Sequence, residues 1–547
     1  MALLEQDIER LEQVQVGVLD MHDTHSTADQ CALDASMGRT QTRCQESVER
    51  GSLMILDAMA DALGGRAALA ATTTETVTAT GVRRHPGWGK VPSEPELVAE
   101  FAYTQTVDVV APRYRLELEA DTKLVPTKLR YTEIGNGSVG YVDGIDFMFD
   151  PRPASTAIPS WRVAARQRHI DLTSVPRLAT KLLDPAADVM IDGSTVTLRE
   201  TGRPPVRVVL DDDSRPARLE IIEEHSPHGD ALVEVRFDDY RPVGALVLPH
   251  HVVITVDGLV VHDETRTVEL DREADFRVPD DAVVDASAAQ SAYANYATEW
   301  LMNYVLAGVR FYFDLQTTPT DPEPVDVAPG VKIVLGPSHN VLVVEMDDHV
   351  VAVDAPLYDE YTRAALAQVK RAFPGKPLRK VIGTHFHYDH IGGIREFVAD
   401  GGVQVIVGEP SVRYFRDLLN SPHTVDPDRL AGHPVETEVI GVKDSLELPT
   451  ADGGVMRILR IKTDHTEDGL VVHLSKPGLL FESDLWNPTP VMPAPNSGRG
   501  RLAVQLYDGI KELGLDVQTI VSGHSGTDGH TLAHSAPLGF LKTAAGY

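Results

Sequence analysis

The segment THFHYDH, residues 384–390, carries ligand-type side chains at a spacing that is hard to explain by packing alone. Three imidazoles and one carboxylate lie within six residues, directly after the predicted strand at 379–383. They belong to His385, His387, Asp389 and His390. Imidazole and carboxylate are the ordinary protein ligands of catalytic zinc and of related ions. On a tight loop, the first two histidines can face one metal while the aspartate and the last histidine face a neighbouring one. The segment therefore predicts a two-metal site.

This H-x-H-x-D-H pattern resembles the central motif of the metallo-β-lactamase superfamily, and the family's other motifs can be matched in the same chain order. The resemblance covers residues 323–547. One position departs from the family pattern, because Asp464 stands where a glycine usually precedes the third-motif histidine. The other matched residues are Asp354 in VVAVDAP, His465 in KTDHTEDGLVV, Asp484 at the end of GLLFESD, and His524 in TIVSGHSG.

The resemblance implies a role for each of these residues, seven of which would be metal ligands. One metal would be bound by His385, His387 and His465, the second by Asp389, His390 and His524, and both by Asp484. Asp354 would hold the ligand loop, and Asp389 would be the catalytic residue that orients the hydroxide nucleophile. The implied cofactor is a pair of divalent ions, zinc first, with iron or manganese as alternatives.

The ligand set favours a hydrolase. Together, His390 and Asp484 are typical of glyoxalase II-like, lactonase-like and phosphodiesterase-like members, so we expect hydrolysis of a small ester, thioester, lactone or amide. Three alternatives stay open: an iron-dependent, persulfide dioxygenase-like enzyme, a phosphodiesterase, and a binding module without catalysis. Asn487 counts against a lactonase, because lactonase-like members carry a tyrosine at this position.

Candidate substrate contacts follow the bridging aspartate in the segment LWNPTPVMPAPNSGRGR. Loops at strand ends usually carry specificity in such folds. We therefore predict that Trp486 forms a wall of the pocket, that Asn487 lies beside it, and that Arg499 or Arg501 meets an anionic group of the substrate.

The elements that must position these residues divide the chain into four parts. Residues 1–70 show apolar positions at helical spacing, and residues 71–280 show alternating strands with a helical stretch near 158–183. Consecutive strands without helices between them predict an antiparallel, curved sheet, similar to the half-barrel of lipoprotein-carrier proteins. A helical connector and proline-rich linker at 281–322 lead into residues 323–547, where strands and helices alternate. The expected fold class is α+β and multidomain: a C-terminal αββα metallo-β-lactamase fold, preceded by the β-rich domain and the N-terminal helices.

The strand-rich region shows no clustered ligand pattern. We therefore expect the first 320 residues to tune the site without supplying catalytic groups. A chain that begins near Thr320 is expected to fold and to bind two metals, because about 220 residues can bury a core of their own.

The charge balance limits the partners. The 81 acidic and 50 basic residues give a net charge of −31, which disfavours nucleic acid because its binding depends on lysine and arginine. The expected partner is a small-molecule substrate. No stretch approaches about 18 uninterrupted apolar residues, and the N-terminus lacks a hydrophobic signal core, so we expect no membrane partner and a cytoplasmic location. The sequence leaves a homo-oligomer open.

Overall fold

The computed structural model describes residues 54–123, 127–146, 153–158, 160–225, 227–280, 324–336, 339–488, 498–524 and 534–547. The helices predicted within residues 1–53 and the connector predicted at 281–322 lie outside these ranges. Residues 54–62 are helical, and the short helix α4 (Arg66–Ala71) follows them. Among the described residues, no helix combines the length and the apolar character that crossing a membrane requires.

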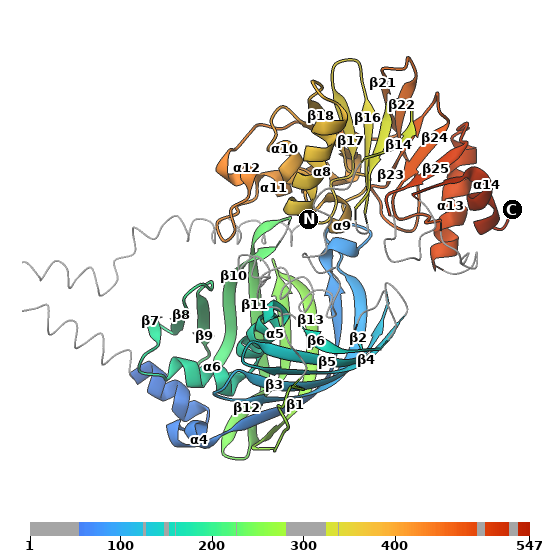
Figure 1. The fold of residues 1–547 in the computed structure, drawn as a ribbon. Coiled ribbons are helices and arrows are strands. Elements are labelled where there is room, and N and C mark those ends of the chain that lie inside the picture. The colour runs from blue at the N-terminus through green and yellow to red at the C-terminus, as the bar shows by residue number, and fades with distance from the viewer. Residues whose placement is uncertain are drawn as a thin grey trace, which may run out of the picture.

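Residues 74–270 form one sheet of thirteen strands in which β1 pairs with both β2 and β13. All neighbouring strands are antiparallel, and buried and exposed side chains alternate along them, as in β3. The sheet curves around helices α5 (Ser160–Thr173) and α6 (Val175–Leu182), which share its apolar core (Figure 1). The strands are β1 (Thr74–His85), β2 (Glu96–Asp108), β3 (Arg113–Thr122), β4 (Lys128–Asn136), β5 (Val139–Ile145), β6 (Ala154–Ile158), β7 (Asp188–Asp192), β8 (Thr195–Arg199), β9 (Val206–Leu210), β10 (Pro216–His225), β11 (Gly229–Val243), β12 (Leu246–Val256) and β13 (Leu259–Leu270). The predicted antiparallel, curved sheet is confirmed.

The C-terminal part contains two sheets, of seven and six strands, with helices on their outer faces (Figure 1). The first sheet contains β14 (Val325–Ala328), β15 (Val331–Val334), β16 (Val341–Glu345), β17 (Val350–Val353), β18 (Leu378–Ile382), β19 (Gln404–Gly408) and β20 (Val439–Val442). The second contains β21 (Ser445–Pro449), β22 (Val455–Arg460), β23 (Leu470–Leu474), β24 (Leu479–Glu482), β25 (Thr519–Ser522) and β26 (Ser535–Pro537). The helices are α8 (Asp359–Ala372), α9 (Tyr388–Ile391), α10 (Ile394–Val398), α11 (Val412–Asn420), α12 (Arg429–Gly432), α13 (Gly498–Glu512) and α14 (Leu538–Ala544).

Three apolar layers hold this part together. One layer joins α8, α10 and α11 to the first sheet, the second lies between the sheets, and the third joins α13 and α14 to the second sheet. Strands of the first sheet such as β17 are buried along their whole length because both of their faces are covered. The layer order is αββα, so the predicted fold class is confirmed.

The β-rich domain packs directly against the αββα domain. Leu357, Tyr361 and Tyr388 of the second domain belong to the same buried apolar cluster as the core of the first. A polar contact lies beside it, where the Asp230 carboxylate accepts a hydrogen bond of 2.8 Å from the backbone N–H of Thr424. The two domains therefore share one buried apolar cluster.

Candidate metal centre

Four strands end at one edge of the αββα domain, and each is followed closely by a residue singled out from the sequence. Strands β17 and β18 are parallel neighbours in the first sheet, and β24 and β25 are parallel neighbours in the second. The carboxyl ends of parallel neighbours meet at one edge, which is where open α/β sheets bind ligands. Asp354 follows β17, His385 follows β18, Asp484 follows β24, and His524 follows β25.

The structure brings the predicted ligands together in two groups, and within each group the ligand atoms lie within 4.8 Å of one another. One group is His385, His387, His465 and Asp484; the other is His339, Asp389, His390 and His524. The division of the predicted ligands is the one that the family resemblance implies. His339 is an addition that the sequence did not indicate.

Asp484 lies between the two groups and turns one carboxylate oxygen toward each. Its Oδ2 lies 3.0 Å from Nε2 of His465 and 3.4 Å from Nε2 of His385. Its Oδ1 lies 2.5 Å from Nε2 of His524 and 3.2 Å from Nε2 of His390. A carboxylate with one oxygen toward each group can bridge two ions.

The carboxylate of Asp354 links the loops that carry the candidate ligands. This buried carboxylate accepts hydrogen bonds from the Thr384 N–H at 2.9 Å, from the Ser483 hydroxyl at 2.6 Å and from Nδ1 of His390 at 3.2 Å. The backbone φ of Asp354 is 64°, a left-handed conformation that aspartate tolerates better than most residues. With Nδ1 of His390 engaged in this way, Nε2 of the same ring is left for the metal group.

Burial and charge oppose one another at Asp389 and His390. Burial raises the pKa of Asp389, but His390 and the hydrogen bond from His339 outweigh it and hold this pKa well below its ordinary value. Burial lowers the pKa of His390, but the carboxylates of Asp484 and Asp389 outweigh it and raise this pKa well above its ordinary value. An electrostatic field that stabilises a buried imidazolium also stabilises a buried metal cation.

The donor set fits two divalent ions. Each group offers three imidazoles, and the carboxylates of Asp389 and Asp484 complete the ligands that zinc and its neighbours accept. Oδ1 of Asp389 is a buried atom that has no hydrogen-bond partner among the described residues. Buried oxygens normally have a partner, and a cation or its water would supply one here.

Comparison with known sequences identifies this part of the chain. The sequence profile of the metallo-beta-lactamase superfamily matches residues 335–524, the segment that contains every residue of both ligand groups. This segment belongs to the metallo-β-lactamase superfamily. A linear primary-alkylsulfatase from Pseudomonas sp. is 30% identical over 114 residues, which make up 21% of this chain and 16% of the relative. The chain thus matches about a sixth of that relative's length.

Solved structures align with about two fifths of the chain. A stereoselective inverting sec-alkylsulfatase from Pseudomonas sp. has 18% identity and a TM-score of 0.31, with 41% of each chain covered. A metallo-beta-lactamase from Pontibacter korlensis has 16% identity and a TM-score of 0.31, with 41% of this chain and 97% of its own covered. The mono-zinc form of the metallo-beta-lactamase FIM-1 from Pseudomonas aeruginosa has 20% identity and a TM-score of 0.31, with 42% and 96% covered.

His339 joins the second ligand group from the segment just before β16. Its Nε2 lies 3.3 Å from Oδ2 of Asp389, and its ring centroid lies 4.0 Å from that of His524. The backbones of His339 and His524 also form an isolated antiparallel bridge. A lone histidine in GPSHN has no ligand spacing to signal it, so sequence reasoning could not find this residue.

The predicted substrate contacts are placed differently from expectation. Trp486 is only 3% exposed and packs in the apolar layer under α13 and α14, which corrects the prediction that it walls a pocket. Buried Glu482 holds it there, because one carboxylate oxygen accepts the N–H groups of Leu485 and Trp486 at 3.0 Å each. The indole therefore turns into the core.

Two of the other predicted substrate contacts, Asn487 and Arg501, bind other protein side chains. Asn487 accepts a hydrogen bond of 2.5 Å from the hydroxyl of Ser522, which links the ends of β24 and β25. Arg501 is exposed and pairs with Asp464 at 3.1 Å, so the residue that replaces the family's glycine contacts α13. Arg499 is the second residue of α13, and its side chain lies outside the described part of the structure.

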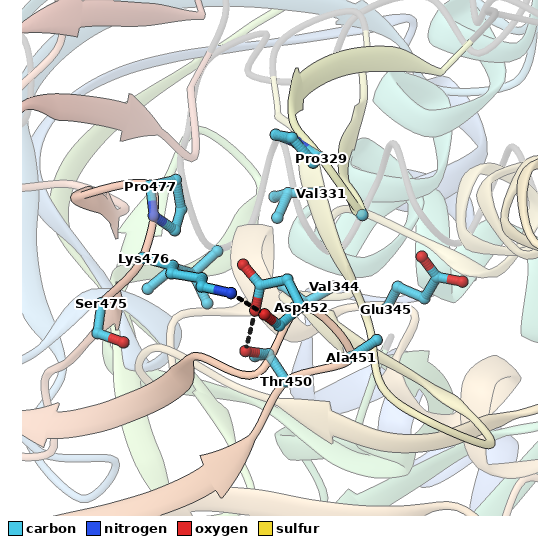
Figure 2. Close-up of a pocket in the computed structure, with 12 residues that line it drawn as sticks. Pro329, Val331, Val344, Glu345, Thr450, Ala451, Asp452, Ser475, Lys476 and Pro477 are labelled. Carbon is cyan, nitrogen blue, oxygen red and sulfur yellow. Dashed lines mark hydrogen bonds between the residues drawn. The ribbon is translucent and has the colours of Figure 1, made fainter.

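A hollow of about 210 Å³ lies at the opposite end of the two sheets (Figure 2). Its lining comes from the β14–β15, β21–β22 and β23–β24 turns and from the end of β16. Within it, Thr450 donates a 2.6 Å hydrogen bond to Asp452, and Lys476 donates to the Asp452 carbonyl. The hollow contains none of the candidate ligands. A smaller hollow reaches His385, His465 and Asp484 themselves, so we place the chemistry there.

Proposed function

We propose that this protein is a metal-dependent hydrolase that uses two divalent ions, held by the two ligand groups, to cleave a small ester, thioester, lactone or amide. The observation that carries the proposal is Asp484, whose two oxygens face different ligand groups. A carboxylate placed in this way can contact an ion in each group. The membership of residues 335–524 in the metallo-β-lactamase superfamily supports the same reaction type.

The chain's own residues have separable tasks in such a reaction. When bound, the two ions would supply Lewis-acid activation of water and of the substrate's oxygen. Asp389 turns Oδ2 toward His339 and leaves Oδ1 without a protein partner, so Oδ1 is the atom to accept a hydrogen bond from the attacking water. Asp354 fixes the ring of His390, and Asp484 fixes the spacing of the two groups.

Zinc is the proposed metal because the ligands are mainly imidazoles, with iron or manganese as alternatives. A persulfide dioxygenase-like enzyme would use one iron and one ligand group. Here the second group is as complete as the first, which favours two ions over one. A binding module without catalysis would be expected to lack ligands, and the described residues retain the predicted set.

The local similarity to a linear primary-alkylsulfatase adds sulfate esters to the proposed substrate classes. Phosphodiesters of nucleic acids rank below these, because the net charge of −31 repels a polyanion. A short alkyl sulfate carries a single charge and an apolar tail, so this objection applies to it much less.

The test combines metal analysis with a substrate panel. Elemental analysis of protein purified without chelator should give about two metal ions per chain. The panel should contain an activated ester, a thioester, a lactone, a β-lactam, a phosphodiester and a linear alkyl sulfate, with Asp484→Asn as the inactive control. Hydrolysis that is lost in Asp484→Asn supports the proposal. A reproducible single iron per chain, or hydrolysis that persists in Asp484→Asn, contradicts it.

A further inference from the structure

The connection between β1 and β2 of the β-rich domain reaches the candidate metal centre. It begins with the short 3-10 helix η2 (Pro86–Trp88) and continues through Gly89. The carbonyl oxygen of Gly89 lies 2.9 Å from Nε2 of His387, a distance at which the ring N–H donates to it. This contact joins residues that are 298 positions apart in the chain.

The connection is fixed in place from several sides. His85 accepts a hydrogen bond from the Gly87 N–H at 2.9 Å, and its ring stacks on Trp88 at 4.2 Å and on Tyr388 at 4.9 Å between centroids. These three aromatic residues are buried. Tyr388 is the neighbour of His387 in the chain, so the stack aligns the connection with the ligand loop.

A second hydrogen bond holds the other end of this stretch. The carbonyl of Lys90 accepts a 3.0 Å hydrogen bond from the Glu467 N–H, two residues after the candidate ligand His465. Gly89 thus lies between two contacts with the ligand segments. One is the ring stack on Tyr388, beside His387, and the other is the hydrogen bond from Glu467, near His465. The position of the Gly89 carbonyl relative to His387 is set by both domains together.

The contact has a chemical consequence for His387. An imidazole that donates from Nε2 to a carbonyl keeps its lone pair on Nδ1, which is then the atom available to a metal. Nδ1 of His387 is the nitrogen that faces the ligand group, 3.9 Å from Oδ2 of Asp484. Without the Gly89 carbonyl, the His387 ring could carry its proton on Nδ1 instead, or rotate about its side-chain bonds.

We propose that the Gly89 carbonyl positions His387 as a metal ligand, so that the first ligand group is completed only when the β-rich domain is docked. The inference rests on the proposed function, because it takes His387 as a ligand. It agrees with the expectation that the first 320 residues tune the site without supplying catalytic groups. It departs from the expectation that a chain beginning near Thr320 binds two metals by itself. The first 320 residues supply a backbone oxygen that sets the tautomer and orientation of one ligand.

Gly89 offers a direct test, since a Cβ at this position would lie 1.9 Å from the carbonyl oxygen of Glu94. Gly89→Ala must therefore separate the backbone of residue 89 from that of Glu94, within the connection that carries the carbonyl. Gly140→Ala is the matched control: its Cβ would meet the side chains of Val163 and Ile158 at 2.5–2.7 Å, in the same domain but in strand β5. Strands β3 and β4 separate β5 from β2 in the sheet.

The readout is zinc binding to the full-length chain, measured by calorimetry with the ion alone. We expect two sites in the unaltered protein and in Gly140→Ala. In Gly89→Ala, one of the two should weaken by about ten- to a hundredfold, as for other groups that orient a metal ligand. Two sites of unaltered affinity in folded Gly89→Ala would overturn the inference. Absence of zinc binding in the unaltered protein would instead overturn the proposed function.

A second measurement keeps the test decisive if Gly89→Ala does not fold. The unaltered protein is labelled with ¹⁵N at its histidines and loaded with zinc. The ring signals of His387 are those that are missing from the spectrum of His387→Ala. The inference predicts a proton on Nε2 that exchanges slowly with water and a metal on Nδ1. Metal on Nε2, or an Nε2 proton that exchanges as fast as that of an exposed histidine, would contradict it.

Discussion

Asp354→Asn tests how the ligand loops are held, with little change in shape. Asparagine also tolerates the φ of 64°, so the substitution changes hydrogen bonding without adding backbone strain. The amide oxygen can take the place of Oδ1, which accepts the Thr384 N–H at 2.9 Å. The amide NH₂ then takes the place of Oδ2, which faces the hydroxyls of Ser483 at 2.6 Å and Thr384 at 3.1 Å and Nδ1 of His390 at 3.2 Å.

The magnitude follows from what each facing group can do. The hydroxyls of Ser483 and Thr384 can turn and accept from the new NH₂, but the N–H on Nδ1 of His390 cannot. Either two donors face each other, or the His390 proton moves to Nε2, the atom that its ligand group needs. A buried donor without a partner costs about 1–3 kcal/mol, which corresponds to about five- to 150-fold in an equilibrium. We therefore expect the second ligand group to lose about ten- to a hundredfold in zinc affinity.

The assay is a zinc competition titration of Asp354→Asn beside a matched control. Asp257→Asn is that control, because Asp257 also has a positive φ, 49°, and accepts a backbone N–H, from Leu232 at 2.9 Å. It lies in the exposed turn between β12 and β13. Asp257→Asn should bind two zinc ions as the unaltered chain does. Unchanged affinity at both sites in folded Asp354→Asn would refute the reasoning that Asp354 sets the His390 ring.

Three further outcomes are expected. His387→Ala and Asp484→Asn should each lower hydrolysis at least about a hundredfold while far-ultraviolet circular dichroism still shows the folded β-rich sheet; near-normal turnover in either would mean that the catalyst lies elsewhere. His339→Ala should weaken zinc binding at one site by about tenfold, whereas an unchanged titration would leave His339 as a packing residue. Burial raises the pKa of Asp171, but Arg177 and Lys181 outweigh it and lower this pKa to about 2. The stability from this shift is present above about pH 4 and is lost as the pH falls toward 2. Asp171→Asn should therefore lower the unfolding free energy by about 2 kcal/mol at pH 7 and by less at pH 3, and a loss that does not depend on pH would contradict this origin.

Much of the architecture could be predicted because its signals are periodic. Alternating side chains along strands such as β3 predicted the antiparallel sheet, and the alternation of strands and helices after residue 323 agreed with an αββα domain. The ligand groups could be predicted because their side chains follow strand ends in a fixed order. Asp354 and Asp484 are examples, each within two residues of a buried strand.

The parts that could not be predicted depend on contacts between distant segments. His339 enters its group through a backbone bridge to His524, which no local spacing reveals. Gly89 contributes a carbonyl, and a backbone atom leaves no mark on residue type. Trp486 was assigned to a pocket because it follows the bridging aspartate, but the hydrogen bonds to Glu482 turn its backbone toward the core.

The central claim is that Asp484 joins two metal ions. Crystals of the zinc-loaded protein, measured on both sides of the zinc absorption edge, would test it most directly. We predict two anomalous peaks about 3.5–4 Å apart, one in each ligand group, with one oxygen of Asp484 directed at each peak. A single peak, or two peaks of which one has no contact with Asp484, would contradict the account.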